Sequence, residues 1–437
     1  MPAFSRLSIA QIPRRVRPIR DEPVPVLPAS YWLLLLFLLL LYANTPFVLP
    51  AAEVIHPAKL VAGATLLAVL IETLSGRRDF SFPWPEGGWL IAFVAAAAVS
   101  CITALWPGYA VEAVLDLAKM ALVYFLLATG ASSARALQGV MWVMIVGGMF
   151  PALGTLKNYL QGNLYEGRAA WVGIFANPNE VAYSLVILLP LAAYLASTRG
   201  WMVRLPLLGI SICFVAAIYV TFSRGGLMGL VAVAGLYAWR KRSLWLSVSL
   251  VILVAAGLVL AGRNWSRGED FSQLDNDVSL QQRMATFDAG FNMFLDHPLL
   301  GVGPRCSVVA WPLYAPPGIR ARGALITHNT FVQIFSETGI LGAIPFLMFI
   351  ATGLWYARKL VLERRTKDLG IGVEVAIWGF VVCGMSGGYV ITWFPYVLLG
   401  LAAAARRVAK ESPVEDPVAH QRTARPRPFG LVRDTPV

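Results

Sequence analysis

The residues of this sequence best suited to chemistry are arginines that interrupt long apolar stretches. Arg224 lies in the segment Thr221-Phe-Ser-Arg-Gly-Gly226, between two such stretches with hardly any loop. An arginine so placed can extend to a membrane surface and contact lipid phosphates. It can also serve as a planar, bidentate clamp for a phosphate or diphosphate substrate. Because polar residues at membrane depth are costly and usually functional, we favour the clamp.

A second candidate site surrounds His328. The segment that begins at Thr327 is expected to be helical with Thr327 as its N-cap, which places Asn329, Gln333 and Glu337 on one stripe. The positive end of the helix dipole then disfavours a charged imidazolium at His328, and a neutral imidazole can accept a proton. From the residues alone, a structural hydrogen-bonding role is favoured, since that is the commoner role of an isolated histidine.

A third group of polar residues opens another expected helix. Asn177 and Pro178 form a typical N-cap and first-turn pair, and Glu180 suits the first turn. Capping explains Asn177 and Glu180 completely. Arg168 and Asn179 are left as candidate binding residues.

Two further motifs are weak indications of a site. Asp275 and Asp277 form a D-x-D pattern of the kind that metal-dependent glycosyltransferases use, but they lie in a polar loop with no flanking strand. A solvated pair is favoured. Gly301 and Gly303 predict a tight turn rather than a phosphate loop, because no strand and helix flank them. We therefore expect no metal, no cofactor and no nucleotide site.

The composition shows which elements must position these residues. The chain is 57% hydrophobic and only 14% charged, whereas soluble domains carry about a quarter charged residues. Its apolar residues form runs of about 20, the length that crosses a bilayer. The net charge of +12 does not indicate nucleic acid, because the basic residues form short clusters between those runs.

About twelve membrane spans are predicted, beginning near residues 31, 57, 88, 110, 138, 179, 204, 225, 243, 336, 371 and 390. If the arginine-rich N-terminus is cytoplasmic, each second connection should be cytoplasmic and rich in Lys or Arg. The sequence meets this test, for example at Arg77-Arg78, at Arg240-Lys241-Arg242 and at Arg406-Arg407. Both termini are therefore predicted to be cytoplasmic.

The predicted fold is all-α, with a single transmembrane domain over 29–410 that contains a large periplasmic loop at about 262–327. A cytoplasmic tail over 1–28 precedes this domain, and a disordered cytoplasmic tail over 411–437 follows it. Eight arginines fall on the outer side: Arg168, Arg224, Arg263, Arg267, Arg283, Arg305, Arg320 and Arg322. For Arg263, Arg267, Arg320 and Arg322, contact with lipid or solvent is favoured.

The order of several motifs resembles the O-antigen ligase and polymerase superfamily, from about Arg168 to Leu347. These motifs are Ser223-Arg224-Gly225-Gly226 at the start of a span, Arg283 ahead of His297-Pro-Leu-Leu-Gly-Val-Gly303, and His328-Asn329 ahead of Gly339 and Gly342. The resemblance implies a metal-independent glycosyltransferase of the GT-C class in the bacterial inner membrane. Its donor would be a glycan on undecaprenyl diphosphate at the periplasmic side. Its acceptor would be a hydroxyl of lipid A-core, of another glycan or of a protein.

The resemblance also assigns roles to individual residues. The family's outward arginines and histidine map onto Arg168, Arg224, Arg283 and His328. We expect His328, Arg224 and Arg283 to be catalytic, and we expect Arg168, Asn179, Asn329 and Glu337 to bind substrate. Fixed cations would stabilise the departing diphosphate, and either His328 or Glu337 would accept the acceptor's proton. The sequence leaves both bases open.

A ligase-like transferase is the main hypothesis, and a polymerase of the same superfamily is the alternative. A flippase or transporter of lipid-linked oligosaccharide would use the same arginines. Transporters, however, place binding groups near the bilayer midplane at a repeat interface, and this sequence shows no internal repeat. Outward arginines together with a histidine also argue against a non-catalytic membrane subunit.

Overall fold

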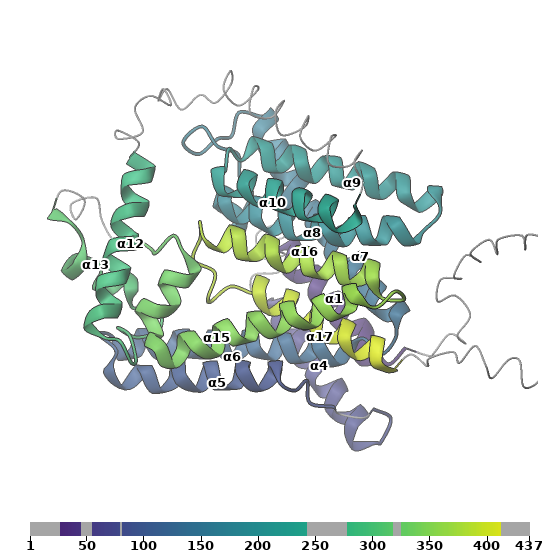
Figure 1. The fold of residues 1–437 in the computed structure, drawn as a ribbon, viewed down its shortest axis with the longest axis horizontal. Coiled ribbons are helices and arrows are strands. Elements are labelled where there is room, and N and C mark those ends of the chain that lie inside the picture. The colour runs from purple at the N-terminus through teal and green to yellow at the C-terminus, as the bar shows by residue number, and fades with distance from the viewer. Residues whose placement is uncertain (1–26, 45–54, 79–80, 243–277, 318–324, 412–437) are drawn as a thin grey trace, which may run out of the picture.

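The computed structural model describes residues 27–44, 55–78, 81–242, 278–317 and 325–411. Within these ranges the protein consists of thirteen α-helices and two short 3-10 helices without a β-strand, which confirms the all-α prediction. The α-helices, labelled as in Figure 1, are α1 Ala29–Ala43, α4 Pro57–Leu74, α5 Glu86–Ser100, α6 Pro107–Gly130, α7 Ala134–Leu160, α8 Pro178–Thr198, α9 Trp201–Val220, α10 Arg224–Lys241, α12 Val278–Asp296, α13 Ser307–Tyr314, α15 Thr330–Leu362, α16 Lys367–Gly384 and α17 Phe394–Glu411. The 3-10 helices are η1 Cys101–Thr103 and η2 Gly173–Ala176.

Helices begin close to the predicted start of every span except the one near residue 243, which lies outside the described residues. Six are long and apolar enough to cross a membrane: α4, α5 with its η1 extension, α7, α8, α9 and α15. Helix α1 is apolar but shorter. The chain is therefore a multi-pass membrane protein.

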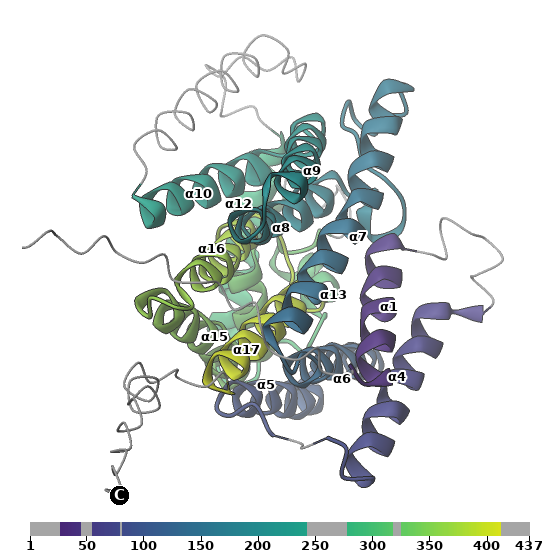
Figure 2. The same ribbon diagram turned by 90° about the vertical axis from the view of Figure 1, so that its right-hand side faces the viewer.

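Helix α8 lies at the centre of the bundle, where α9, α10 and α16 pack around it. In the apolar 18-residue segment of α8, 72% of the residues are buried, whereas the corresponding share in α4 is 11%. Helix α4 packs against α1 at the periphery (Figure 2). Side chains at the N-terminal end of α8 are therefore enclosed by protein rather than by lipid.

The two ends of the bundle carry different charged residues. At the C-terminal end of α10, Arg240 binds the carboxylate of Glu374 through its Nε at 2.8 Å, and Lys241 lies 2.6 Å from Asp368. Arg224 begins the same helix, about 24 Å away at 1.5 Å per residue. The outer and inner arginines predicted from the sequence thus lie at opposite ends of α10. Which end faces the cytoplasm stays a prediction.

The predicted long loop contains two helices that the sequence analysis did not anticipate. Helix α12 stands across the ends of α5, α6 and α15 (Figure 1), and α13 packs beside it. Helix α12 buries Ala285, Ala289 and Met293, and it leaves the apolar side chains of Phe287 and Phe291 exposed. It carries too many polar residues to be identified as a span, and this is why it was missed.

Helix α15 is broken at Gly339, whose φ of 58° and ψ of −162° are not helical. Such a conformation is essentially restricted to glycine. In an unbroken helix the amides of Ile340 and Leu341 would bond the carbonyls of Ser336 and Glu337. The break leaves these four backbone groups in need of other partners.

Residues 297–303, which we call the strap, fill the break. Two strap carbonyls accept hydrogen bonds from the freed α15 amides, and two strap amides donate to the freed carbonyls. The bonds are Ile340 N to Pro298 O at 2.8 Å, Leu341 N to Leu299 O at 3.2 Å, Val302 N to Ser336 O at 2.9 Å and Gly303 N to Glu337 O at 3.0 Å. Non-helical backbone is tolerated at membrane depth when protein satisfies it in this way. The strap confirms the predicted turn and holds the first half of α15, which carries the candidate site.

Candidate functional site

Arg283 and His328 line one pocket with a volume of about 250 Å³. They come from different parts of the fold, since Arg283 lies on α12 and His328 lies just before α15. The complete lining is Arg283, Met284, Thr286, Phe287 and Asp288 from α12, Thr327, His328 and Asn329 ahead of α15, and Met385 after α16. The structure thus joins a predicted cation and a predicted base in one place.

His328 precedes the N-cap of α15. The cap is Asn329, whose side chain accepts hydrogen bonds from the amides of Phe331 at 2.9 Å and Val332 at 3.1 Å. The predicted cap, Thr327, was therefore wrong: it lies two residues too early. Burial, and then the charge of Arg283, lowers the pKa of the His328 imidazole from 6.5 to about 4. The ring is neutral at physiological pH and has a lone pair that can accept a proton.

The guanidinium of Arg283 is anchored by Ser386. Its Nη1 donates a 2.7 Å hydrogen bond to Ser386 Oγ, and the Ser386 carbonyl accepts a 3.2 Å hydrogen bond from the Tyr183 hydroxyl. Ser386 follows α16 and Tyr183 lies on α8. The loop after α16 therefore connects α12 with the central helix.

The same loop is tied to the start of α15. Thr330 Oγ1 donates to the Gly387 carbonyl at 2.6 Å and accepts from the Tyr389 amide at 3.0 Å. Thr330 is fully buried, and Gly388 lies against the Thr327 carbonyl. His328 and Arg283 are thus fixed to one loop from two sides.

Arg168 and Asn179, the pair left over by the sequence analysis, bind each other. Arg168 Nη2 donates to Asn179 Oδ1 at 2.7 Å, and Arg168 Nε donates to the Thr221 carbonyl at 2.9 Å. The Ser223 hydroxyl donates to the same Asn179 oxygen at 2.7 Å. This chain of bonds joins the N-termini of α8 and α10. It also holds Arg168 beside the segment that carries Arg224.

Arg224 is the first residue of α10, and Ser223 is its N-cap. The next residue, Gly225, contacts the other half of the site: a Cβ at this position would collide with the Tyr183 hydroxyl and lie 2.7 Å from the Ser386 Cβ. The backbone beside Arg224 therefore packs on the residues that anchor Arg283.

Three helix N-termini meet around these arginines. Helices α8, α10 and α15 all begin at this end of the bundle, with Asn177, Ser223 and Asn329 as their N-caps. Each contributes a partial positive charge and free backbone amides. Together with Arg168, Arg224 and Arg283 they bring positive charge to this end of the bundle, an arrangement that suits a bound anion.

Glu337, the alternative base, has other partners. Its carboxylate is 2% exposed and accepts hydrogen bonds from Ser307 Oγ at 2.6 Å, from the Arg305 amide at 2.9 Å and from Gln333 Nε2 at 3.3 Å. Gln333 and Glu337 lie on one stripe of α15, as expected, and are in contact. Glu337 is not among the residues that line the pocket. Its position connects α15 to α13. Of the two candidate bases, the pocket therefore contains His328.

The remaining sequence predictions have mixed outcomes. Arg305 forms a 2.7 Å ion pair with Asp116, which also pairs with Lys119 at 2.9 Å. Several predicted residues lie outside the described part of the chain: Arg263, Arg267, Asp275, Asp277, Arg320 and Arg322. Among the described residues no three His, Cys, Asp or Glu side chains come together. Metal independence stays a prediction.

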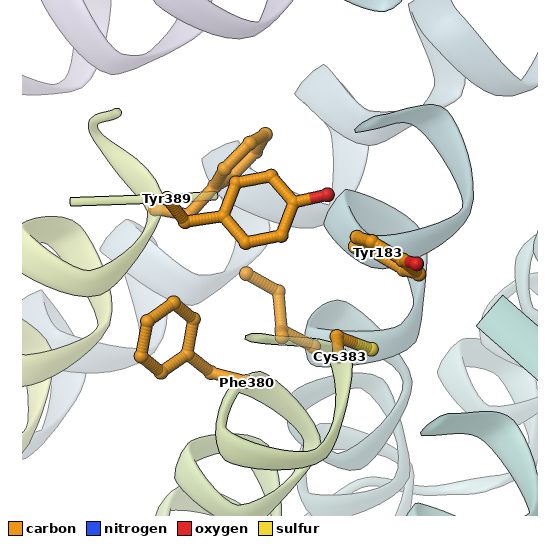
Figure 3. A pocket seen from close by; sticks show the side chains of 6 residues that line it. Tyr183, Phe380, Cys383 and Tyr389 are labelled. Carbon is orange, nitrogen blue, oxygen red and sulfur yellow. The ribbon is translucent and has the colours of Figure 1, made fainter. Parts of the chain in front are cut away.

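Sequence reasoning missed Tyr183, Ser386 and Tyr389. Figure 3 shows Tyr183 and Tyr389 side by side around a small buried cavity, with the Tyr389 hydroxyl on the Tyr183 side. Their rings pack edge to face with centroids 5.4 Å apart. The sequence Ser386-Gly387-Gly388 in the short connection after α16 was the one available indication, because paired glycines often mark a close backbone approach.

Comparison with known proteins agrees with this geometry. Residues 208–347, which include Arg224, Arg283 and His328, match the family model described as O-Antigen ligase. The exopolysaccharide production protein ExoQ of Rhizobium meliloti (strain 1021) is 26% identical over 322 residues, which cover 67% of this chain and 71% of ExoQ. The teichuronic acid biosynthesis protein TuaE of Bacillus subtilis (strain 168) is 26% identical over 224 residues, which cover 46% of this chain and 45% of TuaE. The family match and both relatives support the O-antigen ligase and polymerase superfamily.

Proposed function

We propose that this protein transfers a glycan from an undecaprenyl diphosphate-linked donor to an acceptor hydroxyl at the periplasmic face of the bacterial inner membrane. The observation that carries the proposal is the pocket shared by Arg283 and His328. It places a fixed cation beside a neutral imidazole, next to the helix that begins with Arg224.

The reaction needs both groups. The acceptor oxygen attacks the anomeric carbon while the bond from that carbon to the diphosphate oxygen breaks, and the bonding electrons leave with the diphosphate. Arg224 and Arg283 stabilise the negative charge that develops there, since a guanidinium matches phosphoryl oxygens in a bidentate way. The hydroxyl proton passes to His328.

A bound donor makes His328 a better base. In the free protein the positive charge of Arg283 helps to lower the pKa of this imidazole to about 4. A diphosphate against Arg283 brings negative charge to the same place, and a nearby opposite charge favours the protonated ring. We therefore expect the pKa of His328 to rise when the donor binds.

The proposal has three versions, which differ in the class of the acceptor. A ligase-like role with lipid A-core as acceptor is the first candidate, because the matching family model carries that description. A polymerase role, with another glycan as acceptor, is the second candidate, because one relative is named for exopolysaccharide production. A protein hydroxyl is a third acceptor known from the superfamily.

The glycan pattern of a deletion strain tests the proposal. Unattached long chains indicate a ligase, and single repeats indicate a polymerase. A pattern identical to that of the parent strain, after loss of the only copy of this gene, would contradict both. Complementation with His328→Ala would then show whether this pocket is responsible.

A further inference from the structure

Ser386 connects two helices of the site through two different atoms. Its hydroxyl oxygen accepts the 2.7 Å hydrogen bond from Arg283 Nη1, and its carbonyl oxygen accepts the 3.2 Å hydrogen bond from the Tyr183 hydroxyl. A guanidinium on α12 is thereby linked to a side chain on α8 by a single residue. The proposed roles of Arg283 and His328 in the reaction do not by themselves depend on this link through Ser386.

The backbone next to the other arginine, Arg224, packs against the same pair. Gly225, the neighbour of Arg224, leaves no room for a Cβ between itself, the Tyr183 hydroxyl and Ser386. The N-terminus of α10 therefore rests on the Tyr183–Ser386 pair.

The pair itself cannot easily shift. Tyr183 is 3% exposed and packs edge to face on the fully enclosed ring of Tyr389. The loop that carries Ser386 is held by Thr330 through the Gly387 carbonyl. Displacing either residue would disturb packed neighbours, which protein interiors resist.

We propose that Tyr183 and Ser386 form a spacer that fixes the Arg283 side chain relative to the N-terminus of α10, which carries Arg224, so that the site selects a diphosphate over a monophosphate. This inference rests on the proposed function. A monophosphate satisfies one guanidinium, whereas a diphosphate presents two phosphoryl groups at a set spacing. Arginine side chains lose rotamer entropy when they bind a ligand, so positions that are fixed in advance favour the ligand that engages both.

Ligand binding by the purified full chain in detergent tests the spacer. The probes are undecaprenyl diphosphate and undecaprenyl phosphate, measured at one ionic strength. We expect the wild type to prefer the diphosphate by about tenfold or more, the equivalent of about 1.4 kcal/mol. Ser386→Ala and Tyr183→Phe should reduce this preference to within about threefold, mainly by weakening diphosphate binding. Ser386→Thr should retain the preference for the diphosphate, because threonine keeps the hydroxyl.

Two controls separate the spacer from general damage. Ser211→Ala removes a hydroxyl that bonds only the Leu207 carbonyl within α9, and it should leave the preference unchanged. In a double-mutant cycle, Ser386→Ala should cost little once Arg283→Lys is present, because Ser386 acts through Arg283. A merely structural role for Ser386 would give additive losses.

The outcomes distinguish the spacer from the proposed function. If the wild type prefers the diphosphate and both Ser386→Ala and Tyr183→Phe keep the full preference, the spacer alone is overturned. A wild type without any preference would overturn the diphosphate clamp, and the spacer with it. Both variants keep nearly the wild-type volume, and monophosphate binding that stays unchanged shows that the site is folded.

Discussion

The imidazole of His328 and the guanidinium of Arg283 line one pocket, and the charge of the arginine contributes to keeping the imidazole neutral. In the proposed mechanism Arg283 has two roles. It would stabilise the departing diphosphate, and its charge adds to the effect of burial in lowering the pKa of His328. His328 is available as a base at physiological pH, and its strength depends on whether the anion is present.

Rate profiles against pH should show this coupling. Only the neutral ring can accept a proton, so the rate falls as pH falls through the pKa of His328. For kcat/KM, which reports the free protein, we expect this fall near pH 4. For kcat, which reports the donor complex, the fall should lie at higher pH.

Arg283→Gln provides the matched test of the same coupling. Removing the positive charge raises the pKa of His328, so the acidic fall of kcat/KM should move to higher pH. Identical acidic limbs in kcat and kcat/KM, both unmoved by this variant, would show that His328 is not the titrating base.

The arginine clamp depends on the shape of the guanidinium as well as its charge. Arg224→Lys and Arg283→Lys should each reduce turnover on the order of 100-fold, because lysine lacks the bidentate fork. Arg199→Lys is the control, since Arg199 bonds Gln138 at the other end of α8. Arg320→Lys should also be mild. Near-normal turnover in both clamp variants would remove the clamp from the mechanism.

Metal independence can be tested with the purified protein. Turnover should continue in excess chelator, and Asp275→Ala combined with Asp277→Ala should be tolerated, because arginines supply the positive charge that a metal would otherwise provide. Loss of turnover in chelator, with recovery on adding a divalent cation, would instead support the D-x-D pair as a metal site.

Gly339 is predicted to be essential for the break in α15. A Cβ there would collide with the backbone of Leu299 in the strap, and its φ and ψ exclude other residues. Gly339→Ala should therefore lower the unfolding temperature sharply or prevent folding. Gly162→Ala is the control: Gly162 has a similar φ of 74° but no atom within 4 Å of its Cβ position, so only about 1–2 kcal/mol of backbone strain is expected. Equal effects of the two substitutions would mean that the strap does not require the glycine.

The sequence predicted where most of the described helices begin, because apolar runs and arginine clusters are local features that membrane insertion imposes. It did not predict α12, whose polar residues interrupt its apolar ones, or the cap at Asn329, which differs from Thr327 by two positions. It also missed Ser386 and Tyr183. Their importance arises from contacts between α8, α12 and the loop after α16, and no local pattern records such contacts.

The assignment of Glu337 shows the same limit. Its spacing from Asn329 and Gln333 was correct, but spacing along one helix does not reveal what lies opposite. The strap and α13 bring Arg305 and Ser307 to its carboxylate, and this leaves the pocket to His328. Only the tertiary structure separates the two candidate bases.

Glycan transfer by purified His328→Ala tests the central claim most directly. The assay uses an undecaprenyl diphosphate-linked glycan as donor, a suitable acceptor, and wild type and variant at equal, folded concentrations. We predict that the variant binds the donor but turns over on the order of 100-fold or more slowly, since positioned proton transfer contributes about 10² to 10⁴. A variant that binds the donor and transfers the glycan within a few-fold of the wild-type rate would contradict the account and make Glu337 the better candidate.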